Sequence, residues 1–386
     1  MSAPSLTHVS SQRPSFHIDS LDGIRGCAAL LVFFSHAGFG SVIPGGFGVT
    51  VFFFLSGYLI TTLLRHEYER TADINLKQFY IRRAFRILPP MYVVLIILLL
   101  PFLNNSRPHA ITTGALAAQF LNFVNYYFIF FGDKHAVPTT GPMWSLAIEE
   151  HFYLLFPLML LFLLRNFGAT RAAHVCIGIC AIILVWRLVL LFALHIDSRK
   201  TFYEYTYMAT DARIDSLLYG CVMALSMNPV LDLRTRLVSR TTWLAMLFTA
   251  AALLLFSFIY RAEWARESIR YSIQGVALIP IFFCAIHYSR WPMFRWLNWA
   301  WMRGMGTISY TFYLIHLKAL EVAARYFDSQ SWAARLLALS MAIAFSTLMY
   351  FLVERYCAKF RRRFAKSQGD SLPRSVGLNG TNRVPR

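Results

Sequence analysis

The sequence contains little charge, and acidic charge is the scarcest. Only 15% of its 386 residues are charged, with 19 Asp and Glu against 37 Lys and Arg. Roughly a quarter of the residues in an ordinary soluble domain are charged, so this composition argues against a water-soluble fold. Apolar residues make up 57% of the chain and aromatic residues 16%, as is typical of a protein that meets lipid over much of its surface.

Several features of metal and cofactor proteins are also missing. The six cysteines form no Cys-x-x-Cys pair, and the sequence has no zinc-ligand spacing and no glycine-rich phosphate loop. A long internal repeat, as found in some transporters, is absent too. We therefore expect no metal and no permanently bound cofactor, and we expect the cysteines to be buried as small apolar residues.

The start of the chain and its charge distribution exclude two further classes. Residues 1–20 are polar and lack the apolar core and cleavage site of a signal peptide, so the first apolar run must direct insertion. The net charge of +18 is spread over short loops and the C-terminal stretch. Membrane topology and anionic lipids account for such a distribution, so we expect membrane lipids, and no nucleic acid, as partners.

Apolar runs long enough to cross a bilayer, about 17 to 25 residues, recur throughout the chain. Ten are clear: 23–40, 46–64, 87–103, 143–164, 172–194, 209–227, 241–260, 271–287, 304–323 and 335–353. An eleventh run, 111–131, is interrupted by Gln119, Asn122 and Asn125. The sequence predicts an all-α fold, a polytopic membrane helical bundle of about ten transmembrane helices.

Basic clusters favour one orientation, because Lys and Arg gather in cytoplasmic loops. All five clusters lie on one side only if residues 111–131 form an interfacial or re-entrant segment. The clusters are Arg82/Arg83/Arg86, Arg165/Arg171, Arg234/Arg236/Arg240, Arg290/Arg295/Arg303 and Lys359/Arg361/Arg362/Arg363/Lys366. The arginines of residues 261–270 then fall outside and are the exception. Both termini are predicted to be cytoplasmic.

Composition divides the chain into three parts. Residues 1–20 are a polar cytoplasmic segment, residues 21–355 a membrane domain, and residues 356–386 a basic tail rich in Ser, Gly, Asn and Pro. We expect this tail to be disordered and to face anionic lipid.

Ionisable residues occur inside the first apolar run. Such residues are costly at bilayer depth, so each indicates function or a specific buried partner. Arg25 and His36 are three helical turns apart, which puts them on nearly the same face, roughly 16 Å apart along the axis. Asp22 lies close to this stripe. We expect Arg25 at the cytoplasmic boundary and His36 deep in the membrane. Alternatively, Asp22 and Arg25 anchor the helix end and His36 bonds a neighbouring helix.

A second cluster of charge lies in the segment FYIRRAFRILPPMY. Arg83 and Arg86 are three residues apart on one helical face and present guanidinium donors suited to phosphate oxygens. Positive-inside anchoring explains Arg82 equally well and remains open for the other two.

Three further segments place polar residues at helical spacing. In GPMWSLAIEEHFYLLFP, Glu149 shares a face with Ser145 and Tyr153. In TDARIDSLLYG, Asp211 and Asp215 share one face and Arg213 faces away, which indicates either a structural ion-pair network or a substrate contact. In GTISYTFYLIHLKAL, the stripe of Ser309, Tyr313 and His316 indicates either an interhelical hydrogen-bonding face or catalysis.

Together these segments resemble the acyltransferase-3 family of bacterial integral membrane O-acyltransferases. The resemblance rests on LDGIRG through SH, GGFGVTVFFFLSGYLIT, FYIRRAFRILPP, WSLAIEEHFYLLFP, DARIDSLLYG and GTISYTFYLIH, which occur in the family's order and cover nearly the whole chain. It implies a multi-pass protein of the bacterial cytoplasmic (inner) membrane. It also implies transfer of an acyl group, usually acetyl, from cytosolic acyl-CoA (acetyl-CoA) as co-substrate. The implied acceptor is a hydroxyl of a carbohydrate or lipid-linked sugar in the assembly of cell-surface polysaccharide or glycolipid, such as lipopolysaccharide.

The resemblance also implies roles for individual residues. Arg25, Arg83 and Arg86 would bind acyl-CoA, His36 would act as general base, and Glu149 would orient His36 or position the acceptor. Residues with a weaker claim to the polar site are Asp22, Ser56, Tyr153, Asp211, Arg213, Asp215, Tyr313 and His316.

Two other functions remain open at this stage. A transporter or flippase could use the same buried charges as a proton relay or translocation path. An acyl-phospholipid synthase would keep the chemistry and change the acceptor.

Overall fold

The computed structural model describes residues 18–102, 111–192, 199–232 and 239–366, and every regular element in these ranges is helical. Seven helices have at least 18 residues: α2 (Gly45–Thr71), α3 (Leu76–Leu99), α6 (Met143–Phe192), α10 (Arg240–Ile259), α12 (Ile269–His287), α14 (Ala300–Ala323) and α15 (Trp332–Met349). The shorter ones are α1 (Asp19–Phe34), α4 (Thr113–Phe120), α5 (Val124–Phe131), α7 (Arg199–Met208), α8 (Thr210–Arg213), α9 (Asp215–Ser226), α11 (Glu263–Glu267), α13 (Pro292–Arg295) and α16 (Arg355–Lys366). The all-α prediction is confirmed for these residues.

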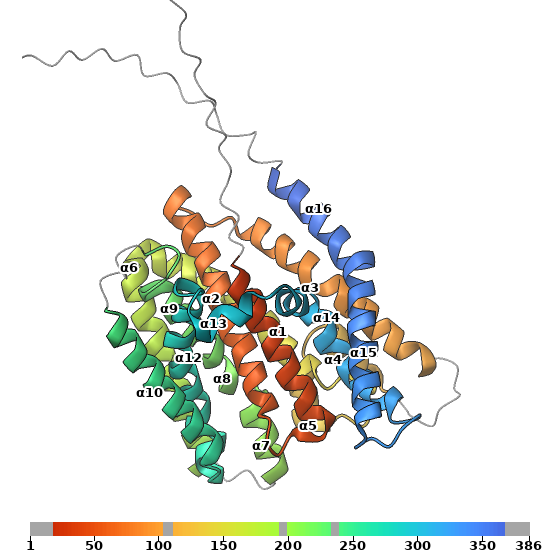
Figure 1. Cartoon of the computed structure of the whole chain (residues 1–386). Helices are drawn as coiled ribbons and strands as arrows, with labels where there is room; N and C mark the ends of the chain where they lie inside the picture. The colour runs from red at the N-terminus through yellow and green to blue at the C-terminus, as the bar shows by residue number, and fades with distance from the viewer. Residues whose placement is uncertain (1–17, 103–110, 193–198, 233–238, 367–386) are drawn as a thin grey trace, which may run out of the picture.

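Helix α1 runs through the middle of the bundle, with α2 beside it, α10 and α12 on one flank and α15 and α16 on the other (Figure 1). Glycine allows its closest packing. A Cβ on Gly306 of α14 would lie 1.9 Å from the backbone oxygen of Asp22, and a Cβ on Gly57 of α2 would lie equally close to the backbone oxygen of Leu217 in α9. In a membrane no hydrophobic effect drives helices together, and small residues allow their backbones to approach this closely. The α1–α14 contact matters most for the candidate site, because it brings His36 and His316 together.

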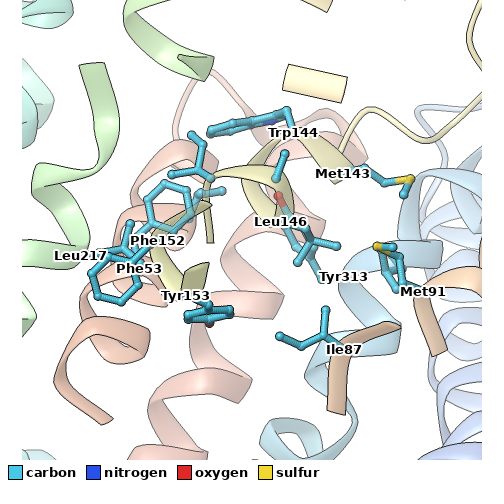
Figure 2. Packing of buried hydrophobic residues seen from close by; sticks show 14 of the residues in the cluster. Phe53, Ile87, Met91, Met143, Trp144, Leu146, Phe152, Tyr153, Leu217 and Tyr313 are labelled. Atoms are coloured by element: carbon cyan, nitrogen blue, oxygen red, sulfur yellow. The ribbon is translucent and has the colours of Figure 1, made fainter. Parts of the chain in front are cut away.

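The apolar core joins α2, α3, α6, α9 and α14. Figure 2 shows Phe53, Met91, Trp144, Leu217 and Tyr313 among the buried side chains of this core. The helices that contribute these side chains come from distant parts of the sequence, so the core fixes their relative positions.

Six helical segments among the described residues are long and apolar enough to cross a membrane: Gly45–Thr71, Leu76–Phe102, Met143–Phe192, Arg240–Ile259, Ile269–His287 and Trp332–Phe360. Two of them, Leu76–Phe102 and Trp332–Phe360, include the short helical segments that continue α3 and α15. The structure thus supports a multi-pass protein without confirming about ten spans. Helix α6 contains the predicted span 143–164 and the described part, residues 172–192, of the predicted span 172–194, and it is broken between them at Gly168, whose φ of 75° is left-handed. The predicted span 209–227 is wrong as one helix, because α8 ends at Arg213 and α9 has only 12 residues.

The ambiguous run at residues 111–131 forms two helices of 8 residues, α4 and α5. Asn122 separates them with a positive φ of 59°. Each helix is about 12 Å long, much less than the hydrocarbon thickness of roughly 30 Å. Neither helix is long enough to cross the membrane alone, which agrees with the predicted interfacial or re-entrant segment.

The predicted disorder of the tail is wrong for residues 356–366, where α16 continues the chain from α15 through the π-helical segment η5 (Tyr350–Glu354). Contact with α3 supports this helix: the rings of Phe360 and Phe85 lie 5.0 Å apart. Residues 367–386 and residues 1–17 lie outside the described residues, as do the basic residues Arg234 and Arg236.

Ion pairs place several basic clusters on one side of the bundle. Arg165 contacts Asp73, between α2 and α3, at 2.7 Å, and Arg65 near the end of α2 contacts Asp232 at 2.5 Å. We therefore expect reporter fusions after Arg171 and Arg240 to read cytoplasmic and a fusion at Lys134 to read periplasmic. A cytoplasmic signal at Lys134 would show that residues 111–131 cross the membrane.

Candidate functional site

The first of two large cavities, the arginine cavity, has a volume of about 450 Å³ and lies between α1, α2, α3, α6, α14 and η5. Arg25, Arg83 and Arg86 line it, together with the carboxylates of Asp22, Glu149 and Glu354. The structure therefore brings together all three arginines that the sequence predicts to bind acyl-CoA. Asp22, near the start of the described residues, and Ala358, near their end, both line this cavity. The two ends of the described bundle therefore lie on one side.

The three arginines differ in their partners. Arg25 donates to Asp22 at 2.8 Å, so the opposite charges of this pair offset each other. The guanidinium groups of Arg83 and Arg86 have no hydrogen bond or ion pair to any described residue. Arg83 instead lies over the ring of Tyr153, 5.4 Å from its centroid. Two guanidinium groups are therefore available to an anion that enters the cavity.

Glu149 is held by two hydroxyl groups rather than by an arginine. Ser56 and Tyr153 each donate to its carboxylate at 2.8 Å. The predicted stripe of Glu149 and Tyr153 is therefore a real contact, and Ser56, predicted as a weaker candidate, completes it. The prediction that Glu149 orients His36 is wrong. Glu149 lines the arginine cavity and His36 does not, and the described hydrogen-bond partner of His36 is His316.

Sequence reasoning missed Glu354. It lies in η5, lines the arginine cavity and accepts a hydrogen bond from Thr311 at 2.6 Å. Single π-helical turns inside longer helices often mark functional positions. The available signal was a carboxylate at the end of a long apolar run, in the segment LVERY.

The second cavity, the histidine cavity, has a volume of about 400 Å³ and contains His36. It lies at the other end of α1, beside the starts of α2 and α6. The predicted stripe of Arg25 and His36 does not lead into one cavity. The helix changes to the π-helical segment η1 (Ser35–Phe39), and His36 is exposed on it. Arg25 and His36 thus open onto different cavities, near opposite ends of one helix.

The ring of His36 is paired with that of His316 in α14. The Nδ1 of His36 lies 3.0 Å from the Nε2 of His316, and the Nδ1 of His316 lies 2.6 Å from the backbone oxygen of Tyr313. A carbonyl oxygen can only accept, so Nδ1 of a neutral His316 carries the proton and its Nε2 is an acceptor. His36 must then donate through Nδ1, which leaves its own Nε2 as an unprotonated acceptor.

A thin wall separates the two cavities. Val49 and Tyr313 line both of them. The hydroxyl of Tyr313 lies 2.8 Å from that of Ser145, which lines the arginine cavity. A group transferred from one cavity to the other would pass this side-chain pair.

The predicted cluster of Asp211, Arg213 and Asp215 lines neither cavity. Asp211 accepts hydrogen bonds from Tyr126, Trp186 and Tyr205 at 2.8–2.9 Å. Asp215 forms a fully buried ion pair at 2.8 Å with Arg187. Arg213 lies 3.7 Å from the centroid of the Tyr271 ring. The contacts of Asp211 and Asp215 favour the structural interpretation of the two that the sequence left open.

These features define a class: a multi-pass helical membrane protein with an arginine-lined cavity and a histidine-lined cavity on either side of a thin wall. A family model described as an acyltransferase domain matches residues 18–351. The chain therefore belongs to the acyltransferase-3 family.

The relatives are O-acetyltransferases. The peptidoglycan O-acetyltransferase OatA of Listeria monocytogenes is 32% identical over 324 residues, which cover 78% of this chain and 49% of the relative. The O-acetyltransferase OatA of Staphylococcus aureus is 31% identical, with 81% and 52% covered. The chain thus spans about half the length of these curated relatives. No solved structure matches the chain.

Proposed function

We propose that the protein is a membrane O-acyltransferase that moves an acetyl group from cytosolic acetyl-CoA to a hydroxyl of a cell-surface glycan. The observation that carries the proposal is the pair of guanidinium groups in the arginine cavity that form no hydrogen bond or ion pair with a described residue, with His36 beyond the wall of that cavity. The names of the relatives point to peptidoglycan, and not to the glycolipid or lipopolysaccharide expected from the sequence, so an amino-sugar polymer of the peptidoglycan type is the proposed acceptor.

The arginine cavity suits the donor. A CoA head group is polyanionic, and Arg83 and Arg86 offer forked donors that match phosphate oxygens in charge and geometry. The cavity then accepts the slender pantetheine arm, whose thioester must reach the wall at Tyr313. Since the arginines lie on the side of the cytoplasmic clusters, both chain ends are proposed to be cytoplasmic and the protein to reside in the bacterial inner membrane.

The histidine pair suits the transfer step. The acceptor hydroxyl attacks the thioester carbonyl, an O–C bond forms, and Nε2 of His36 takes the hydroxyl proton. The C–S bond then breaks, and the CoA thiolate leaves and takes that proton from His36. Through its own bond to the Tyr313 carbonyl, His316 holds His36 in the tautomer with Nε2 free, and it stabilises the imidazolium that forms.

Ligand-dependent thermal stability tests the donor assignment. We expect CoA to raise the melting temperature of the detergent-solubilised protein, whereas pantetheine, which lacks the phosphates, leaves it unchanged. A transporter has no need for a polyphosphate site on one side, so absence of stabilisation by CoA would favour the transporter interpretation.

A positioning role for His316 predicts a specific kinetic pattern. His316→Leu removes the Nε2 acceptor that pairs with His36, so we expect kcat to fall roughly 10- to 100-fold, the range known for residues that orient a metal-ligating histidine. The KM for acetyl-CoA should stay the same, and His316→Gln, which still accepts a hydrogen bond, should recover part of the rate. Equal loss in both variants, or a raised KM, would contradict this role.

A further inference from the structure

We infer that Arg335 of α15 is a positioning residue: it holds the π-helical segment η1, and through η1 it keeps the proposed base His36 in the orientation that acetyl transfer requires. The inference rests on the proposed function and adds a residue that neither the sequence motifs nor the proposed mechanism uses. Arg335 lines neither cavity, so it acts through η1 and not through contact with a substrate.

The backbone of η1 leaves helical geometry directly after His36. Ala37 has a ψ of 18°, and Gly38 has a φ of 98°, in the left-handed region that favours glycine. The N–H of Val42, which a continuing π-helix would direct to Ala37, donates to Phe39 instead. Ala37 is buried, and a buried carbonyl group is costly to leave without a donor. A donor from another element is therefore needed at the residue that follows the base.

Arg335 supplies that donor from the first turn of α15. Its Nε lies 2.9 Å from the backbone oxygen of Ala37, although the two residues are 298 positions apart. Its Nη2 donates to the side chain of Gln330 at 3.0 Å, which fixes the guanidinium plane. Gly38 permits this approach, because a Cβ there would lie 2.8 Å from Oε1 of Gln330 and 3.1 Å from Nη2 of Arg335. The segment that carries His36 is thus bonded to a separate helix.

Two aromatic rings complete the contact between η1 and α15. The guanidinium carbon of Arg335 lies 4.4 Å from the ring centroid of Phe39 and 5.2 Å from that of Trp332. The two rings lie 5.5 Å apart. A guanidinium group over such rings is attracted by their negative faces, so Arg335 contacts η1 on both sides of Gly38. Arg335 also lies at the histidine end of the bundle, so the gathering of arginines in cytoplasmic loops does not account for it.

The position of His36 depends on the backbone of η1. Its side chain is exposed, and the described hydrogen-bond partner of the ring is His316. A change in the backbone at Ala37 would move the ring relative to His316 and to the wall at Tyr313. Misplacement of a reacting group by about 1 Å can cost roughly 10²-fold in rate. Loss of the Arg335 contact should therefore reduce the rate of transfer without touching the donor site.

Steady-state kinetics of the full-length protein test this role, with labelled acetyl-CoA as donor and an N-acetylglucosamine oligosaccharide as acceptor. Arg335→Met removes the hydrogen-bond donors and keeps a long side chain. We expect kcat to fall roughly 10- to 100-fold while the KM for acetyl-CoA stays the same. Arg335→Lys, which retains a charged donor group, should recover part of the rate.

The matched control is Arg261→Met. Arg261 donates to the backbone oxygen of Ser41 at 3.0 Å, a few residues beyond η1. Both residues are exposed, so water can replace the lost bond, and kcat should stay at the wild-type value. An equal fall in kcat in Arg261→Met and Arg335→Met would overturn the inference, because any support of this turn would then have the same effect.

A double variant separates positioning from general stability. If Arg335 acts through His36, the double variant His36→Gln/Arg335→Met should be as slow as His36→Gln alone, whereas an independent structural loss would add to the effect of His36→Gln. An additive loss, or wild-type kcat in Arg335→Met, would overturn the inference.

Hydrogen exchange gives a readout that needs no turnover. Amides of residues 35–43 should exchange faster in Arg335→Met than in the wild type, because η1 loses its bond to α15. Unchanged exchange would overturn the inference. If the wild type transfers no acetyl group, the proposed function fails, and faster exchange in Arg335→Met would still show that Arg335 holds η1.

Discussion

His36→Gln is expected to reduce acetyl transfer by about 10² to 10⁴-fold while leaving CoA binding near normal. Loss of a general base typically costs that much in rate. Glutamine keeps hydrogen-bonding capacity but takes up no proton at neutral pH, so the variant separates a base from a structural hydrogen-bonder. Acetylated product is measured from labelled acetyl-CoA with purified protein, and the Kd for CoA is measured in parallel.

The matched control is His135→Gln, an exposed histidine outside both cavities, which should keep wild-type turnover. Retention of most of the activity by His36→Gln would assign the histidine a structural role and leave another group, such as Glu149, as the base. A parallel loss of CoA affinity would instead show that η1 collapses when the pair with His316 is broken.

Removal of the guanidinium group of either Arg83 or Arg86 is expected to weaken CoA binding by roughly 10- to 150-fold. Arg83→Gln and Arg86→Gln each delete one charge-assisted hydrogen bond to phosphate, which contributes about 1.5 to 3 kcal/mol. Equilibrium binding of CoA to the purified variants measures the effect. Because contacts to phosphate depend on charge, the affinity that remains should also be less sensitive to salt.

The neighbouring Arg82 gives a close control for this prediction. It has the same charge and lies in the same helix, but it bonds Gln78 at 3.1 Å and contacts Glu67 at 3.4 Å, and it does not line the arginine cavity. Arg82→Gln should therefore leave the Kd for CoA unchanged. An equal loss of CoA affinity in all three variants would mean that these arginines act only as a topology signal.

Local sequence patterns predicted which side chains share a helical face in the arginine cavity. Arg83 and Arg86 share a face because they are three residues apart, and Glu149 meets Tyr153 because they are four apart. Such spacings fix neighbours along one helix. Local patterns could not identify a partner from another helix. His36 and His316 are 280 positions apart, and their contact depends on close packing of α1 against α14 at Gly306.

The errors have equally local causes. The three-turn spacing of Arg25 and His36 assumed a continuous α-helix, whereas α1 gives way to a π-helical segment at Ser35. That change puts His36 on the open histidine cavity. The family resemblance implies a partnership of Glu149 with His36, but the two residues line different cavities on either side of the wall at Tyr313.

A single-turnover experiment tests the central claim most directly. Purified protein in lipid vesicles is mixed with a stoichiometric amount of acetyl-CoA labelled in the acetyl group and with excess N-acetylglucosamine oligosaccharide. We predict that the label appears as an ester on a saccharide hydroxyl while an equal amount of free CoA thiol is released. The label should remain on CoA with Arg83→Gln/Arg86→Gln at low donor concentration and with His36→Gln at any concentration. Wild-type protein that binds acetyl-CoA yet releases no thiol in the presence of the saccharide would contradict the account.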